Sequence, residues 1–189
     1  MLARQLNVIL RLGMAYFLAE TVLMPKDPRF AGKAIPLRNV IILSALSLLF
    51  PWLYFFGKRW IRYPFAMDNL YLSIFFLDMA GNSFNLYDRY YYFDLIPHFH
   101  GAGALAYVLK YIFRMPVLSA VGLANMFHIL LEAQEYYTDV LLGTHNVHGV
   151  ADHVNDLLAG LAGTVAYGWL SRSLDRHRHN PRPFRAGSS

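Results

Sequence analysis

The sequence predicts an all-α fold, a polytopic transmembrane helical bundle with about six spans. Hydrophobic residues make up 56% of the 189 residues, and charged residues only 15%. The mean hydropathy is +0.31, and it comes from repeated apolar runs that are hard to bury inside one globular domain of this length. Each run is close to the ~20 residues that a bilayer core requires. The expected spans cover residues 5–23, 40–57, 69–87, 97–114, 117–137 and 154–171.

The first span is the least regular of the six. Arg11 and Glu20 interrupt it, although both side chains could snorkel to the surface or pair inside a bundle. Its short basic start, with Arg4, also resembles a signal peptide. No clear small-residue cleavage site follows, so we expect an uncleaved first helix.

Lysine and arginine placement orients the bundle. With both termini in the cytoplasm, the inside carries Arg4, Lys58, Arg59, Arg62, Lys110, Arg114, Arg172, Arg176, Arg178, Arg182 and Arg185. The outside carries Lys26, Arg29, Lys33, Arg38 and Arg89. This bias satisfies the positive-inside rule, although the loop 24–39 holds four charges on the outer side. We therefore expect an integral membrane protein with a bundle over residues 1–171.

The last segment, residues 172–189, is basic and contains prolines. We expect it to be a disordered cytoplasmic tail that is attracted to anionic lipid headgroups. The net charge of +5 then belongs to membrane orientation. It does not indicate nucleic-acid binding, because no basic surface with interleaved aromatic residues remains once this tail is set aside.

Ionisable residues gather at the outer ends of the fourth, fifth and sixth spans. They are Asp94, His98, His128, Glu132, Glu135, Asp139, His148, Asp152, His153 and Asp156. Carboxylates and imidazoles are costly in or beside lipid, so each needs a partner or a function. A divalent metal ion is the shared partner that we expect, because carboxylates crowded in a low dielectric repel one another.

Helical spacing supports a built site. At ~100° per residue, Asn125, His128, Glu132, Glu135 and Asp139 lie within roughly 80° on one face of the fifth span. Asp152 and Asp156 lie one turn apart on the sixth span. We assign the metal to His98, Glu132, Glu135, Asp152 and Asp156, and the role of general base to Asp94 or Asp139. Oxygen and nitrogen ligands suit Mn, Mg, Ca, Zn or Fe, and the sequence does not choose.

Simpler interpretations stand beside these assignments. Asp94 is equally suited to be the N-cap of a helix that has proline in its first turn. His128 fits a hydrogen-bonded interior residue, and His100 lies about 200° around the helix from His98. Glu132 and Glu135 could form interhelical hydrogen bonds. The histidines at positions 145, 148 and 153 lie in or beside a loop and could be solvated.

Three short elements follow one another in the second half of the chain. They are Asp94-x-x-x-His98, Glu132-x-x-Glu135 and Asp152-x-x-x-Asp156-Leu, the last followed by a helix rich in small residues. With Asn85-Leu-Tyr-Asp88 before them, they cover about residues 80–167 and resemble the YjdF-like inner-membrane proteins. The resemblance implies a small polytopic fold in a bacterial inner membrane and marks these six acidic and histidine positions. It implies no established activity, and Pro97 beside His98 departs from the pattern.

Several classes of chemistry are excluded. The chain has no cysteine, so thiolate metal sites, disulfides and a cysteine nucleophile are absent. No H-E-x-x-H helix, Walker loop or dinucleotide glycine fingerprint occurs.

Three hypotheses of different classes remain, so the sequence leaves open whether the protein is an enzyme. One is a metal-dependent membrane enzyme, for example a hydrolase of a lipid-like substrate. Another is an accessory subunit, or a homo-oligomer, that docks through the small residues Ala159, Gly160, Gly163 and Thr164. The last is a cation or proton pathway that continues inward through Asp78 and Asn82.

Overall fold

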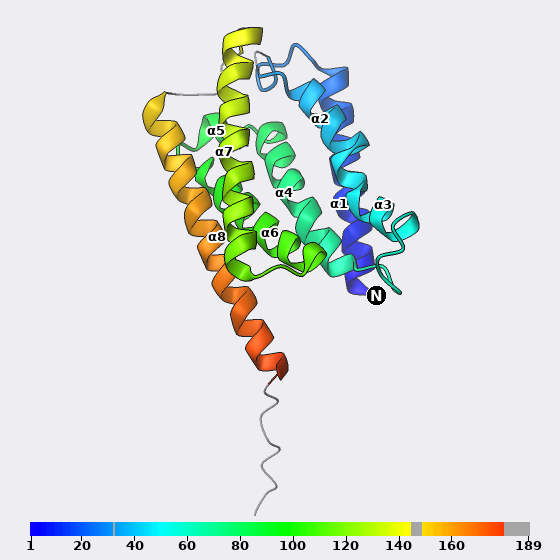
Figure 1. Cartoon of the computed structure of the whole chain (residues 1–189). Coiled ribbons are helices and arrows are strands. Elements are labelled where there is room, and N and C mark those ends of the chain that lie inside the picture. The colour runs from blue at the N-terminus through cyan, green and yellow to red at the C-terminus, as the bar shows by residue number, and fades with distance from the viewer. Residues whose placement is uncertain (32, 145–148, 180–189) are drawn as a thin grey trace, which may run out of the picture.

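The computed structural model describes residues 1–31, 33–144 and 149–179, and in this part of the chain all regular secondary structure is helical. The elements are α1 (Leu2–Leu23), α2 (Ile35–Ser44), the short 3-10 helix η1 (Leu46–Leu48), α3 (Leu49–Phe55), α4 (Phe65–Ser83), α5 (Leu86–Arg89), α6 (Leu95–Phe113), α7 (Val117–Leu142) and α8 (Val150–His179). The long helices lie side by side in one bundle (Figure 1). The predicted helical bundle is therefore confirmed.

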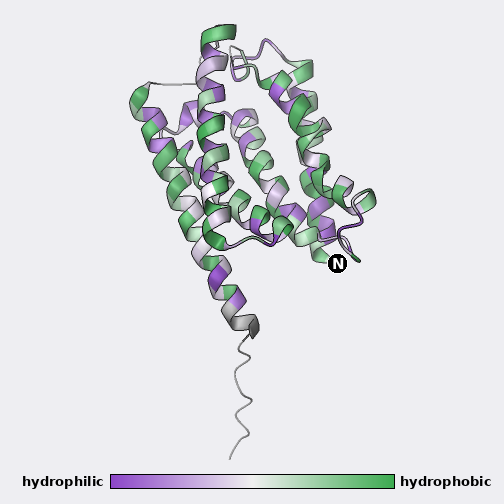
Figure 2. Cartoon of the chain, in the orientation of Figure 1, coloured by the Kyte–Doolittle hydropathy of each residue, from purple (hydrophilic) through white to green (hydrophobic). Residues whose placement is uncertain are grey.

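Three stretches of the described chain are long and apolar enough to cross a membrane: Leu2–Leu23, Ile35–Phe55 and Val117–Leu142. Large apolar side chains such as Leu118 and Leu141 are exposed on the outside of the bundle, as lipid-facing residues would be. Figure 2 shows hydrophobic residues along most of the helices. Helices α4, α6 and α8 occupy the other predicted spans, and the total of six stays a prediction.

The second predicted span is broken in the middle. Pro51 has no backbone N–H, so the carbonyl of Ser47 cannot form its helical hydrogen bond, and the chain passes through η1 between α2 and α3. The guanidinium of Arg11 donates to that free carbonyl at 2.9 Å. Arg11 also pairs with the fully buried Asp68 of α4 at 2.7 Å. The charge inside the first helix is therefore paired, as one of the two expectations for it required.

Helix α6 is the centre of the site-bearing half of the bundle, since it packs against α4, α7 and α8. Its closest neighbour is α8, where small residues allow the two backbones to meet. A Cβ added at Gly163 would lie 1.9 Å from the carbonyl oxygen of Phe99, and one at Gly103 would lie 2.7 Å from the carbonyl oxygen of Gly163. The small-residue face of α8 is thus in contact with α6 of the same chain.

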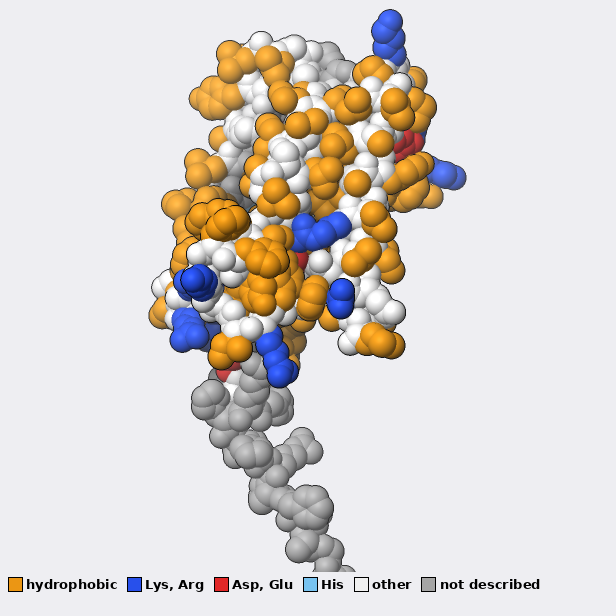
Figure 3. Space-filling view, turned by 90° about the vertical axis from the view of Figure 1, so that its right-hand side faces the viewer, with side chains coloured by type: hydrophobic (Ala, Val, Ile, Leu, Met, Phe, Trp, Pro, Cys, Tyr) orange, Lys and Arg blue, Asp and Glu red, His pale blue; other side chains and the backbone are white. Residues whose placement is uncertain are grey.

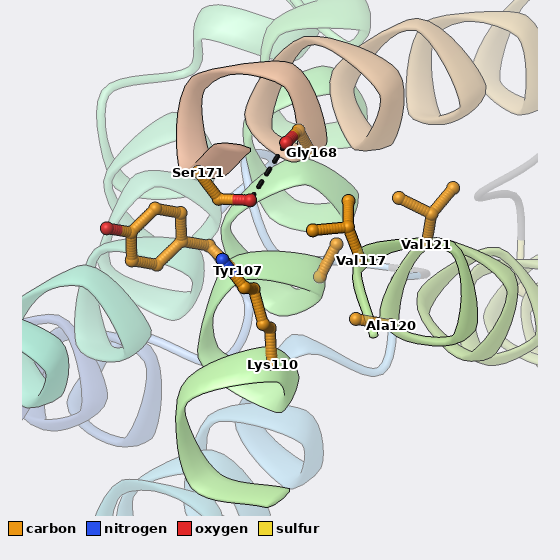
Figure 4. Close-up of a pocket in the computed structure, with 8 residues that line it drawn as sticks. Tyr107, Lys110, Val117, Ala120, Val121, Gly168 and Ser171 are labelled. Carbon is orange, nitrogen blue, oxygen red and sulfur yellow. Dashed lines mark hydrogen bonds between the residues drawn. The ribbon is translucent and has the colours of Figure 1, made fainter. Parts of the chain in front are cut away.

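Near the α6–α7 connection the three helices close tightly. Residues of α6, α7 and α8 surround a hollow that leaves no room for a water molecule, and the Ser171 hydroxyl donates to the Gly168 carbonyl at 2.8 Å (Figure 4). Helix α8 continues past this point through residues 172–179 of the expected tail, and residues 180–189 lie outside the described part. Lys110 of α6 forms an ion pair with Asp175 there.

Most of the positive charges in the loop after α1 are paired with carboxylates. Arg29 contacts Glu20 at 2.9 Å and Asp27 at 2.8 Å, and Lys33 contacts Asp88 at 2.8 Å. Hydrogen bonds from Arg29 lower the pKa of Asp27 to about 2. Glu20, the second charge in the first predicted span, is therefore also paired. Local neutralisation reduces the net positive charge that this loop contributes to the outer side in our predicted orientation.

Candidate metal centre

The first turn of α6 supplies two groups of the candidate site. Asp94 occupies the N-cap position but makes no side-chain capping bond. Its Oδ1 instead lies 3.3 Å from Nε2 of His98, one turn later on the same helix. Pro97 stands in the first turn, where a missing N–H costs nothing. The structure therefore keeps the N-cap position predicted for Asp94 while turning its carboxylate toward His98.

Helix α7 approaches the opposite side of the same imidazole ring. Nδ1 of His98 lies 2.8 Å from Nε2 of His128 and 3.1 Å from Oε1 of Glu132. His128 and Glu132 are themselves 3.4 Å apart, one turn from each other on α7. All three residues are buried, with exposed fractions of 5–9%. Two helices thus bring two imidazoles and one carboxylate into mutual contact.

Helix α8 completes the cluster from its first turns. Oδ1 of Asp156 lies 3.9 Å from Nε2 of His98, on the same side as Asp94. His153, one turn earlier, contacts Oε2 of Glu132 through Nδ1 at 2.7 Å. Asp156 is buried, whereas the side chains of Asp94 and His153 are about one third and one quarter exposed. Access to the cluster from solvent is therefore on the Asp94 side and past His153.

A glycine of α8 makes the space for His128. A Cβ added at Gly160 would lie 2.2 Å from Nδ1 of the His128 ring and 2.3 Å from its Cε1. No real Cβ contact is that short, so the ring can lie where it does only because residue 160 has no side chain. This contact positions His128 against His98 and Glu132.

The donors form two sets that share His98: His98, His128 and Glu132 on one side, and Asp94, His98 and Asp156 on the other. In each set the donor atoms lie within 4.8 Å of one another. Oε1 of Glu132 and Oδ1 of Asp156 are buried and accept no hydrogen bond of good geometry in the described structure. Buried carboxylate oxygens without a hydrogen bond are costly, and a cation would satisfy them.

The donor chemistry also fits a divalent ion. Ligands about 2.0–2.2 Å from a tetrahedral zinc ion are roughly 3.3–3.6 Å apart. The separations of 3.3 Å (Asp94 to His98) and 3.4 Å (His128 to Glu132) are in this range, and 3.9 Å (His98 to Asp156) is close to it. Imidazole and carboxylate without sulfur suit Zn, Mn or Fe.

The structure brings together some of the residues assigned from sequence and separates others. His98, Glu132, Asp156 and Asp94 meet in the cluster. Glu135 lies one turn beyond Glu132 on α7 and is in neither donor set. Asp139 is two turns beyond Glu132, about 10 Å along the axis, and accepts a hydrogen bond from Thr144 at 2.6 Å. Asp152 lies one turn before Asp156 and is also in neither set.

Other polar residues singled out from sequence lie in separate networks. His100 faces away from His98, as expected, and bridges Ser73 of α4 and Tyr167 of α8 at 2.8 Å each. Asp78 pairs with Arg38 at 3.0 Å and accepts from Tyr87 at 3.0 Å. His145 and His148 lie outside the described residues.

Sequence reasoning gave too little weight to two members of the cluster. The sequence favours an interior hydrogen-bonded role for His128 and a solvated position for His153, yet both side chains contact Glu132. The signal for His128 was its i, i+4 spacing to Glu132 on one helix face. No comparable signal identified His153, because its contact depends on how α8 is placed against α7.

No protein-family model, curated protein or solved structure matches this chain. The function is therefore inferred from the geometry of the cluster.

Proposed function

We propose that the protein is an integral membrane protein that binds one divalent metal ion at the His98 cluster and uses it as a membrane-embedded enzyme. The observation that supports this most is Oδ1 of Asp156, a buried carboxylate oxygen that lies 3.9 Å from Nε2 of His98 and has no hydrogen bond in the described structure. We place the site on the extracytoplasmic side, both termini in the cytoplasm and the protein in a bacterial inner membrane. The charge bias of the loops and the resemblance to the YjdF-like proteins support this placement.

Asp94, His98 and Asp156 would hold the ion. A neutral imidazole offers one lone pair, so His98 binds an ion through one ring nitrogen and donates its other N–H. The Nε2 side has the partly exposed Asp94, and a catalytic site needs a position open to water. The Nδ1 side is enclosed by His128 and Glu132, which suits groups that orient the ring.

A bound divalent ion would supply an activated water or polarise an ester or phosphoryl oxygen. Nδ1 of His98 is hydrogen-bonded to Nε2 of His128 at 2.8 Å, which holds the ring of His98 in one orientation, and Oε2 of Glu132 is hydrogen-bonded to His153. The side chain of His153 is about one quarter exposed, so it lies between Glu132 and the solvent. Exposed tyrosines at positions 90, 91 and 92 follow α5 directly and suit contact with the apolar part of a lipid-like substrate.

Elemental analysis of detergent-purified protein tests the metal. We expect near-stoichiometric metal in the wild type and none in a His98→Gln variant. His100→Gln, on the same helix but bonded to Ser73 and Tyr167, is the matched control and should keep the metal. Absence of metal from the wild type after dialysis against Zn²⁺ and Mn²⁺ would exclude the metal site.

Three further variants distinguish the two donor sets from each other and test whether Glu135, a ligand in the assignment from sequence, binds the metal. Asp156→Asn should abolish binding, and Glu132→Gln should weaken it by about 10–100-fold. Glu135→Gln should bind as the wild type does. Loss of metal in Glu135→Gln with retention in Asp156→Asn would contradict the ligand set proposed here.

An accessory subunit that docks onto a larger membrane complex, or a homo-oligomer, remains the second candidate. Gly122 of α7 supports it, because no atom lies within 4 Å of a Cβ added there and that helix surface is open. Co-purification of a stoichiometric partner that is lost in a Gly122→Leu variant would favour this function. We propose no nucleic-acid partner and no transport pathway.

A further inference from the structure

A hollow between the loop before α4 and the end of α6 has the chemistry of an anion site. Its volume is about 270 Å³, and Arg59, Trp60, Tyr111, Ile112 and Arg114 line it. Ligand pockets for drug-sized molecules start at about 300 Å³, so this hollow suits a compact polar group. It lies at the end of the bundle where the N-terminus is, away from the His98 cluster (Figure 1).

The two arginines lack carboxylate partners, in contrast to three arginines that lie within or beside the predicted spans. Arg11, Arg29 and Arg38 each pair with an aspartate or glutamate. Arg114 forms no ion pair and no side-chain hydrogen bond in the described chain, and Arg59 donates only to the Ile112 carbonyl at the end of α6. Two guanidinium groups without counter-charges at one hollow leave donors for an anion.

Aromatic residues make one wall of the hollow rigid. Trp60 is stacked on the fully buried Phe50 of α3, with ring centroids 5.5 Å apart, and Tyr111 of α6 is stacked on Trp60 at 6.0 Å. Arg114 is the C-cap of α6, with φ of 52°, and Pro116 follows two residues later. The arginine positions are therefore set by packed elements of the bundle.

The surroundings indicate where the anion comes from. Lys58 and Arg62 are exposed in the same loop, and Ile61 and Phe113 are exposed apolar residues beside the hollow. Figure 3 shows Lys and Arg side chains gathered near the lower end of one face, next to hydrophobic side chains. Tryptophan, tyrosine and arginine together are typical of the level of lipid headgroups.

We propose that this hollow binds the phosphate group of an anionic phospholipid, with Arg59 and Arg114 as the phosphate donors and Trp60 and Tyr111 as the aromatic wall. The site is independent of the metal site. A phosphate diester on a lipid offers two unesterified oxygens to the guanidinium groups, and its acyl chains can continue along Ile61 and Phe113.

Native mass spectrometry of protein extracted with phosphatidylglycerol or phosphatidylcholine tests this. We expect the wild type to retain one phosphatidylglycerol molecule. In the Arg59→Gln/Arg114→Gln variant the fraction of protein that carries this lipid should fall by about tenfold or more. Lys58→Gln/Arg62→Gln removes the same charge from the same end of the bundle without lining the hollow, and it should retain the lipid. Equal losses in both double variants would mean general surface attraction and would overturn the proposal.

Arg59 also caps the end of α6, so the double variant could lose the lipid because it misfolds. A single variant that keeps Arg59 avoids this problem. Arg114→Asn removes a side chain without partners, and asparagine tolerates a positive φ. It should also lose the lipid. Competition with inorganic phosphate distinguishes the sources: displacement of the lipid by millimolar free phosphate, or retention of phosphatidylcholine equal to that of phosphatidylglycerol, would contradict an anionic lipid site.

Discussion

Replacing Gly160 by alanine tests the part of the candidate site that depends most on geometry. The new Cβ would lie 2.2 Å from Nδ1 of His128, where ordinary contact begins at 3.4 Å. The ring or the helix must therefore move, and ordinary contact is restored by a shift of 1.2 Å, the difference between these distances. A shift of that size in the ring breaks the 2.8 Å contact between His128 and His98.

The expected effect is on metal affinity more than on folding. Groups that orient a metal-bound histidine contribute about 10–100-fold to affinity, so Gly160→Ala should weaken Zn²⁺ binding by that factor. Overpacking costs about 1–3 kcal/mol, but alanine recovers up to about 1 kcal/mol of helix propensity, so the net destabilisation is modest. The measurement is a competitive zinc-indicator titration in detergent, beside a thermal unfolding curve.

Gly122→Ala is the matched control, because it makes the same change in helix α7 where a Cβ meets no atom within 4 Å. It should leave Zn²⁺ affinity unchanged and raise the midpoint of unfolding slightly. If Gly160→Ala bound Zn²⁺ as tightly as the wild type while His98→Gln did not bind, His128 would have no part in the site. The contacts of His128 with His98 and Glu132 would then have no effect on metal binding.

Three other predictions concern stability. Gly163→Ala should lower the unfolding midpoint far more than Gly122→Ala, because its Cβ would meet the backbone carbonyl of Phe99, which cannot rotate away. Arg11→Gln should lower the free energy of unfolding by about 3 kcal/mol, because it leaves the buried Asp68 without its cation. Chemical unfolding measures this, and a double variant that also carries Asp68→Asn should lose little further stability if the two residues are coupled. Burial and the bond to Asp68 raise the pKa of Tyr63 above its usual value, so the folded state keeps this proton longer than the unfolded state does, and the protein loses stability as pH rises above about 10. A tyrosinate absorbance titration checks this: the wild type and a Tyr63→Phe variant should differ by one group that ionises late.

The fold was predictable where the hydrophobic pattern was long and continuous. Apolar runs predicted the helices that became α1, α6 and α7, with ends near those expected. The break between α2 and α3 was missed, although Pro51 was a signal for it, because a window average over the second span hides one missing hydrogen bond. The continuation of α8 through residues 172–179 was not expected, since composition alone favoured a tail there.

The sequence predicted which face of α7 carries the candidate site, but not which residues of that face take part in it. Spacing along α7 placed His128, Glu132 and Glu135 on one face, and it could not say which of them meets the donors of another helix. That depends on how far along its axis α7 passes α6, which is a property of packing. In the structure, Glu132 and His128 are the α7 residues that contact His98, and Glu135 lies one turn further along the helix.

Gly160 matters both to the helix packing and to the candidate site. Sequence reasoning treated it as one of the small residues that allow another helix to approach, which is correct for its neighbour Gly163. At residue 160 the space is filled by an imidazole ring instead of a helix backbone. A glycine on a helix face predicts close approach without naming what approaches, and here the difference decides whether a mutation disturbs packing or the candidate metal centre. For this reason Gly160→Ala and Gly163→Ala, three residues apart on α8, should separate metal affinity from stability.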